Sequence, residues 1–190
     1  NLHEFDITVE LLDQGYRTAH HSAELLPPDI WRMEPVTVDF PMPPTPAHDR
    51  GVVMYDDGEL KITAFEVNHA PIDPAYGYRF DYKGRSIAVG GDTVLHHPMA
   101  KWAQGVDVLF HEAQQQEIVT KMSEVAGAKG SSRLQHILHD IGDYHSSPVD
   151  AATIANEAGA KLLVLYHYTP PLQNFIVRRI FERGVSDVRP

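Results

Sequence analysis

The sequence of 190 residues is long enough to bury a hydrophobic core, and its 43% hydrophobic and 22% charged residues are typical of a globular protein. No apolar run approaches the roughly 20 residues of a membrane span, so no membrane is expected, and the absence of cysteine excludes disulfides and thiolate zinc sites. The formal net charge of −10 counts against a chain whose main task is to grip nucleic acid.

The first quarter of the chain has weak secondary-structure signals. Residues 1–26 have irregular apolar spacing that indicates partial helix, and residues 27–50 carry seven prolines. Proline removes backbone donors and breaks helices, so the second stretch is predicted to be an extended loop. From residue 58 to 69 apolar and polar residues alternate, which predicts a strand, and residues 76–91 predict two strands joined at Lys83–Gly84.

Strand and helix signals alternate over the remainder. A short helix is predicted over 96–105, a strand over 106–113, a helix over 113–126 and a flexible segment over 127–132. Ser147 is a good helix N-cap, followed by Pro148 and Asp150, and Gly159 is a good stop. Residues 161–167 predict a buried strand, and 185–188 predict a last edge strand. This alternation indicates an α/β layered fold.

The segment 172–184 is predicted to be an amphipathic helix. Its apolar residues Phe175, Ile176, Ile180 and Phe181 are expected on one side. The helix would then pack against the rest of the fold through that side.

Four apolar strands deliver an ionisable residue at their carboxyl ends. These residues are His69, Asp92, His111 and His167. In open α/β sheets ligands bind at this edge, and histidine and aspartate supply the nitrogen and oxygen donors that zinc prefers. Each residue alone is explained by an ordinary hydrogen-bonded histidine or a turn aspartate. The occurrence of such a residue after all four strands favours a metal-binding site.

His145 opens a loop in "DYHSSP", directly before a predicted helix. It is either a histidine of the capping loop or a general acid or base that reaches over the site. The adjacent pairs His20–His21 and His96–His97 are interpreted as structural, because consecutive side chains point in different directions. The same interpretation is given to His3, His48, His136 and His139.

Three stretches together resemble a known family. They are "VNHAPIDPAYGYRFDYKGRSIAVGGDT", "VDVLFHEA" and "YHSSPVDAATIANEAGAKLLVLYHYTPP", within residues 58–175. They resemble the second half of metallo-β-lactamase-fold hydrolases, in the branch of ribonuclease Z and the arylsulfatase- or phosphodiesterase-like enzymes. The resemblance implies an αββα sandwich, of which residues 1–190 would form the carboxyl-terminal half plus the proline-rich loop 27–50.

The resemblance also assigns roles to residues. It implies metal ligation by His69, Asp92 and His167, with Asp92 bridging two ions, and catalysis by His145 oriented by Glu112. The residues that would contact the ligands without binding the metal themselves are His111, Thr93 and Ser146. The glycines before Asp92 would let the backbone turn sharply there. The sequence has "HEAQ", "HSS" and "YHYTPP" where the family has HEAT, HST and often HFS.

The family's HxHxDH motif is absent from this sequence. Because that motif supplies most of the remaining zinc ligands, the chain is expected to be the carboxyl-terminal portion of one domain whose upstream half is missing. Such a portion would expose apolar sheet surface and would associate with the missing half or form a homo-oligomer.

The implied chemistry is metal-dependent hydrolysis with two zinc ions, although the ligands also suit manganese or iron. A small phosphodiester or sulfate ester is the first expectation for the substrate. His69 and Asp92 are 23 residues apart, which leaves room for a hairpin only, whereas short-form ribonuclease Z carries its RNA-gripping arm there. A tRNA 3′ endonuclease acting on RNA is the alternative. A non-catalytic binding half is another, and lactam hydrolysis is the weakest.

Overall fold

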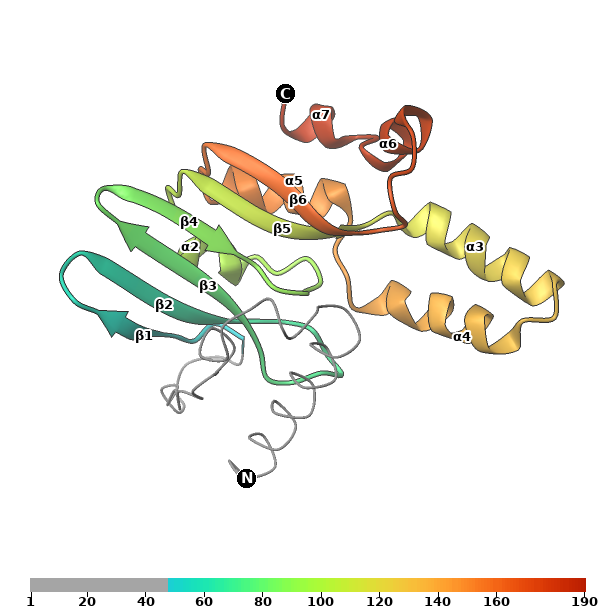
Figure 1. Cartoon of the computed structure of the whole chain (residues 1–190), viewed down its shortest axis with the longest axis horizontal. Coiled ribbons are helices and arrows are strands. Elements are labelled where there is room, and N and C mark those ends of the chain that lie inside the picture. Colours follow the sequence, from blue (N-terminus) through green and yellow to red (C-terminus); the bar gives the residue numbers. More distant parts are fainter. Residues whose placement is uncertain (1–47) are drawn as a thin grey trace, which may run out of the picture. The chain divides into compact units, whose positions relative to one another are not determined.

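The computed structural model describes residues 48–190, and the predictions for residues 1–26 and for most of 27–50 lie outside this range. Six strands form one mixed sheet in the order β1-β2-β3-β4-β5-β6 (Figure 1). They are β1 (Gly51–Asp56), β2 (Leu60–Val67), β3 (Ala75–Tyr82), β4 (Arg85–Val89), β5 (Val108–Gln114) and β6 (Leu162–Thr169). The five strands predicted between residues 58 and 167 are confirmed, and so is the α/β class, but β6 was predicted to be buried and has no fully buried residue, because it is the edge strand of the described sheet.

The direction of the strands changes across the sheet. β1 to β4 pair antiparallel, whereas β4, β5 and β6 pair parallel. The predicted hairpin turn at Lys83–Gly84 joins β3 to β4, with both residues at positive φ. Since β2 also runs parallel to β4, the carboxyl ends of β2, β4, β5 and β6 lie at one edge of the sheet.

Helices pack on one face of this sheet, behind it in Figure 1. The helical members of the main core cluster come from α2 (Pro98–Trp102) and α5 (Pro148–Glu157). The predicted capping box of α5 is confirmed, because Ser147 and Asp150 exchange hydrogen bonds between side chain and backbone. The strand residues of this cluster are Phe65, Val67, Ala88 and Leu109.

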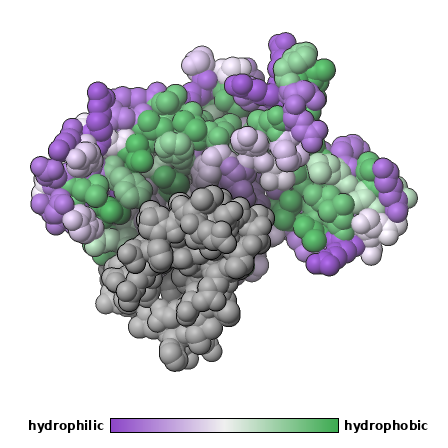
Figure 2. Space-filling model, in the orientation of Figure 1, coloured by the Kyte–Doolittle hydropathy of each residue, from purple (hydrophilic) through white to green (hydrophobic). Residues whose placement is uncertain are grey.

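The opposite face of the sheet carries apolar side chains that are only partly buried. Tyr78 pairs with Val89, Val89 with Phe110 and Phe110 with Val164, so these side chains line one face and alternate with the core residues. Figure 2 shows apolar residues gathered over this side of the sheet. The described residues thus supply one sheet with helices on one face, which agrees with half of the expected sandwich.

Residues 116–140 form a helical hairpin where the sequence predicted one helix and a flexible segment. α3 (Gln116–Ala128) is confirmed, but α4 (Ser132–Asp140) was missed, and only a short turn remains of the predicted flexible stretch. Leu134, Ile137 and Leu138 of α4 have helical spacing, but the segment is short and polar overall, and Leu138 is its only buried residue. The short 3₁₀ turn η3 (Ile141–Asp143) follows.

The carboxyl-terminal elements differ from two predictions. α6 (Phe175–Phe181) forms, but Phe181 is buried while Phe175 and Ile176 are exposed, because six residues carry Phe181 about 240° around the helix from Phe175. The predicted edge strand at 185–188 is the short helix α7 (Val185–Val188), stabilised by local bonds such as Arg189 N–H to the Val185 carbonyl. Within residues 48–190, no helix has the length and apolar character to cross a membrane.

Candidate metal centre

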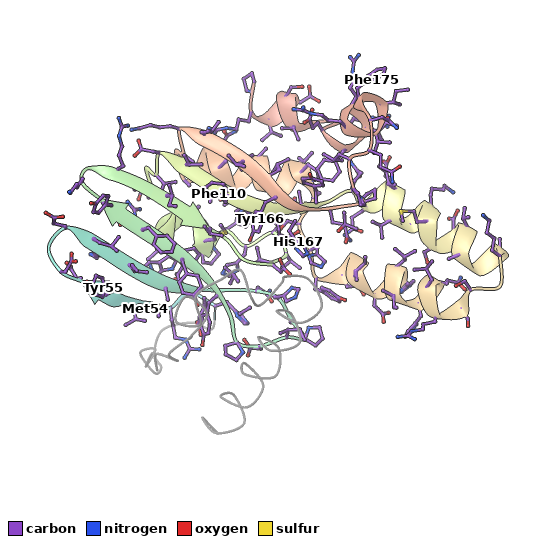
Figure 3. All side chains as sticks on the ribbon, viewed as in Figure 1. Met54, Tyr55, Phe110, Tyr166, His167 and Phe175 are labelled. Atoms are coloured by element: carbon purple, nitrogen blue, oxygen red, sulfur yellow. The ribbon has the colours of Figure 1, made fainter. Side chains whose placement is uncertain are left out.

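The residues predicted from the strand ends meet at the carboxyl edge of the sheet. His69 follows β2, Asp92 follows β4, Glu112 lies on β5 and His167 lies near the end of β6. His145 comes from the loop before α5. Figure 3 shows His167 at this edge, beside Tyr166. The parallel direction of these four strands therefore explains why residues nearly 100 positions apart become neighbours.

Three side chains form a group that fits a metal ion. Ligand atoms of Asp92, His145 and His167 all lie within 4.8 Å of one another. Nδ1 of His167 is 2.8 Å from Oδ1 of Asp92. Two imidazoles and a carboxylate are a donor set that suits zinc and other first-row transition metals. The side chains present thus fit the metal that the resemblance implies.

His69 lies beside this group without being one of its three members. Its ring centre is 5.4 Å from that of His145, which in turn is 5.7 Å from that of His167. Nδ1 of His69 is 2.9 Å from the carbonyl oxygen of Tyr144. A carbonyl only accepts, so Nδ1–H donates and the lone pair of His69 is on Nε2, as in metal-ligating histidines held by a backbone carbonyl.

Glu112 holds the site together from inside the protein. Its side chain is fully buried, and Oε1 accepts hydrogen bonds from the backbone N–H of Ser146 at 2.9 Å and of Thr93 at 3.3 Å. Oε1 also lies 3.1 Å from Nδ1 of His145. The hydroxyl of Ser146 donates to the Thr93 carbonyl at 2.6 Å. One carboxylate therefore fixes the Asp92 turn and the His145 loop relative to β5.

His145 is held toward its charged form. Burial alone lowers the pKa of His145, but the hydrogen bond and charge of Glu112, together with the charge of Asp92, outweigh it and raise the pKa. The carboxylate of Glu112 accepts from Nδ1–H, so Nε2 of His145 is the nitrogen available to a ligand. The same nitrogen can donate a proton or ligate a metal, depending on whether it is protonated.

His111 stands apart from the other histidines. It is fully buried, its Nδ1 donates to the carbonyl of Glu112 at 2.7 Å, and burial lowers its pKa. Successive residues of a strand point to opposite faces, so His111 and Glu112 do not both face the site. Among the described residues, Nε2 of His111 has no hydrogen-bond partner. Its place is compatible with a structural role.

The backbone at the site takes conformations that few residues adopt. Gly91 has φ of +68°, and a Cβ there would lie 2.6 Å from the Tyr76 carbonyl oxygen, so only glycine fits. His167 has φ of +45°, in the left-handed region that is costly for a residue with a side chain. The glycines before Asp92 therefore serve the turn that aims its carboxylate at His167.

Sequence reasoning missed two tyrosines at this edge. Tyr144 holds His69 through its carbonyl, and its ring lies 5.1 Å from the rings of both His69 and His145. Tyr166 is half-buried next to His167, and burial and the charge of Asp92 raise its pKa. The position of Tyr144 directly before His145 was the one signal available in the sequence.

Comparison with known proteins agrees with the fold. A family model described as the beta-lactamase superfamily domain matches residues 21–168, which is more than half of the chain. The chain belongs to this superfamily. The matched range includes all the residues of the candidate site and nearly all of the sheet that positions them.

The curated relatives are named ribonuclease Z. One from Mycobacterium tuberculosis, named putative ribonuclease Z, is 35% identical over 160 residues, covering 84% of this chain and 60% of that protein. Another, from Mycolicibacterium gilvum, is 34% identical over 161 residues, covering 85% of this chain and 48% of the relative. The crystal structure of the short form of human tRNase Z aligns with a TM-score of 0.46 and 25% identity, over 65% of this chain and 41% of that one. The chain thus spans about half the length of the relatives that it matches.

Proposed function

We propose that this protein is the carboxyl-terminal part of a metal-dependent hydrolase that cleaves phosphodiester bonds in RNA. The observation that carries the proposal is the cluster of Asp92, His145 and His167 at the carboxyl edge, in a chain 35% identical to a protein named ribonuclease Z. Those relatives favour RNA over the small phosphodiester or sulfate ester that the sequence first suggested. No feature of the described residues favours a sulfate ester.

The ligands of the metal are proposed to be Asp92, His167 and His69. Asp92 and His167 already face each other at 2.8 Å, and His69 has its Nε2 free because Tyr144 binds its Nδ1. Metal bound there would supply Lewis-acid chemistry, lowering the pKa of water and neutralising charge on the phosphate. A site of two ions needs more ligands than these, which the remaining half of the domain would supply.

His145 is proposed to serve the leaving group. Cleavage forms a bond from a water oxygen to phosphorus and breaks the bond from phosphorus to the ribose oxygen, which then needs a proton. Nε2 of His145 is free to deliver it, while Glu112 binds Nδ1 and stabilises the charged ring. Glu112 acts here by positioning His145, because it is buried behind the ring and does not reach the substrate.

The exposed apolar face of the sheet is proposed to bind the other half of the domain. Phe110 on β5 and Val164 on β6 lie on this face and are only partly buried. The part matched here is 60% of one relative and 48% of the other, so each relative contains a further large segment of chain. A second layer over this face would complete a sandwich and bury apolar surface that a stable protein seldom exposes.

The test is a cleavage assay with three substrates on zinc-loaded protein that includes the proposed remaining half of the domain, because the two-ion site needs ligands from that half. The substrates are a tRNA precursor with a 3′ extension, a small aryl phosphodiester and an aryl sulfate. We expect cleavage of the RNA and weak cleavage of the aryl phosphodiester, with both lost in Asp92→Ala. Cleavage of the sulfate alone would refute the RNA assignment. Bound zinc with no cleavage of any substrate would indicate the non-catalytic binding half.

A further inference from the structure

We propose that the groove between β6 and the two last helices binds the backbone of single-stranded RNA next to the metal centre. This inference deepens the proposed function, on which it rests, by naming a surface that would hold the substrate. The groove is lined by Lys161 and by β6 residues 162–165 and 168, together with residues of α6, α7 and the segments that adjoin them, and it has a volume of about 1040 Å³. We call it the β6–α6 groove.

The groove runs along most of β6 and reaches the residue next to the proposed metal ligand His167. Tyr168 lines it and directly follows His167, whereas Lys161 and Leu162 line it at the opposite end of the strand. Eight residues of strand span roughly 26 Å, which is room for several nucleotides. A strand of RNA lying in the groove would therefore lead away from the bond that is cut.

The charge of the groove is opposite to the charge of the chain. Residues 161–190 carry five Lys and Arg against two Asp and Glu, whereas the chain as a whole carries 16 against 26. All five of these cations line the groove: Lys161, Arg178, Arg179, Arg183 and Arg189. Because the chain as a whole is acidic, a polyanion would be attracted to the basic β6–α6 groove and repelled by the acidic surface elsewhere. The acidic Glu182 also lines the groove.

Two of the arginines have little holding them to the protein. The side chain of Arg179 is exposed and makes no hydrogen bond or ion pair within residues 48–190, and the side chain of Arg183 has only an exposed ion pair with Glu117 at 3.9 Å. By contrast, Arg178 donates to Glu182 at 2.8 Å and Arg189 to Asn156 at 2.8 Å. Guanidinium groups that the fold leaves free are the ones available to phosphates.

The apolar wall of the groove adds a surface for bases. Tyr168 is 44% exposed as a residue, and its ring packs edge-on against buried Phe181, with ring centres 6.2 Å apart. Grooves that bind single strands combine a basic track with aromatic rings on which bases stack. Figure 2 shows hydrophilic and apolar residues side by side over α6 and α7, which agrees with this combination.

A protein partner is the competing occupant. Within the described sheet β6 is an edge strand, so a polypeptide could also add a strand there. The observations favour RNA. A polypeptide that adds a strand to β6 would leave the arginines of the groove unexplained, and an acidic peptide would leave the exposed ring of Tyr168 unexplained. The two occupants differ in their dependence on charge and on bases, which the experiment below measures.

The experiment measures the anisotropy of a fluorescein-labelled single-stranded RNA of about 12 nucleotides, in EDTA so that binding is separated from hydrolysis. The groove variant is the double substitution Arg179→Ala with Arg183→Ala. The matched control is Arg85→Ala with Arg133→Ala, which also removes one ion-paired and one unpaired exposed arginine, outside the groove. A third protein, Arg179→Lys with Arg183→Lys, keeps the charge.

We expect the groove variant to bind the RNA roughly tenfold more weakly at about 0.1 M salt. The slope of log K against log salt concentration should become shallower by about 1.4, because two phosphate contacts are lost. The control and the lysine protein should stay within about twofold of the unaltered chain. Absence of RNA binding, equal loss in the control, or tighter binding of an acidic peptide of the same charge would each overturn the proposal. RNA binding without zinc-dependent cleavage would refute the proposed function alone.

Discussion

At the carboxyl edge of the sheet, one fully buried carboxylate accepts hydrogen bonds from two other segments of the chain. The α3–α4 hairpin, by contrast, buries only Val119, Ala126 and Leu138 as its small core. It leaves large apolar side chains such as Val125 and Leu134 exposed. The edge is held by buried polar contacts between segments far apart in sequence, and the hairpin by local apolar contacts. Substitutions in the two regions should therefore differ in what they disturb.

The largest effect is expected at Asp92. Asp92→Ala removes the only carboxylate of the three-residue group, so zinc affinity should fall by more than about 100-fold. Asp143→Ala is the control, an exposed aspartate of η3 outside the group. Elemental analysis after dialysis against zinc gives the answer. Equal zinc in both variants would show that the group is not a metal site.

Metal content also separates the two roles open to His145. A proton donor can be removed without loss of metal, whereas a ligand cannot. We therefore expect His145→Ala to retain most of its zinc while cleavage of RNA falls by about 10²- to 10⁴-fold. His136→Ala, an exposed histidine on α4, is the control. Loss of zinc from His145→Ala would instead make His145 a ligand.

The next effect is on stability, at Glu112. Glu112→Ala leaves the N–H groups of Thr93 and Ser146 buried without their acceptor, which should lower the free energy of unfolding by about 3 kcal/mol. Glu117→Ala changes an exposed carboxylate with a single distant ion pair and should cost less than about 0.5 kcal/mol. Urea unfolding of the metal-free proteins measures both. Similar midpoints would mean that the buried network does not hold the edge together.

The hairpin should respond locally. Leu138→Ala removes the largest side chain of its small core and should cost about 2–3 kcal/mol, whereas Leu134→Ala removes an exposed side chain and should cost under about 1 kcal/mol. In Leu138→Ala the backbone amide hydrogens of α3 and α4 should exchange faster, while those of β5 stay as protected as before. The reason is that the core of the hairpin shares no residue with the main core cluster of the sheet and helices α2 and α5. Loss of protection throughout the sheet would contradict the separation of the two regions.

The difference between the regions also explains what the sequence could predict. The strands before His69, Asp92 and His167 are strongly patterned, and parallel strands bring their carboxyl ends together, so the meeting of these three residues at one edge follows from the sequence. The resemblance supplied their roles, which the structure leaves as predictions. α4 escaped prediction although Leu134, Ile137 and Leu138 have helical spacing, because the segment is short and mostly polar. The role of Tyr144 escaped prediction because Tyr144 binds His69 through its backbone carbonyl, a group that every residue has.

The smallest effect expected is a dependence of stability on pH at the edge. The pKa of His145 is raised in the folded protein, because Glu112 and Asp92 outweigh the cost of burial. The stabilisation is therefore fully present below the unfolded pKa of about 6.5 and is lost as pH rises through the folded pKa. His145→Gln should remove this part of the pH dependence while the exposed His136→Gln keeps it. Urea midpoints of the metal-free proteins between about pH 5.5 and 8.5 test this, and parallel profiles for unaltered protein and His145→Gln would show that Glu112 does not bind a charged ring.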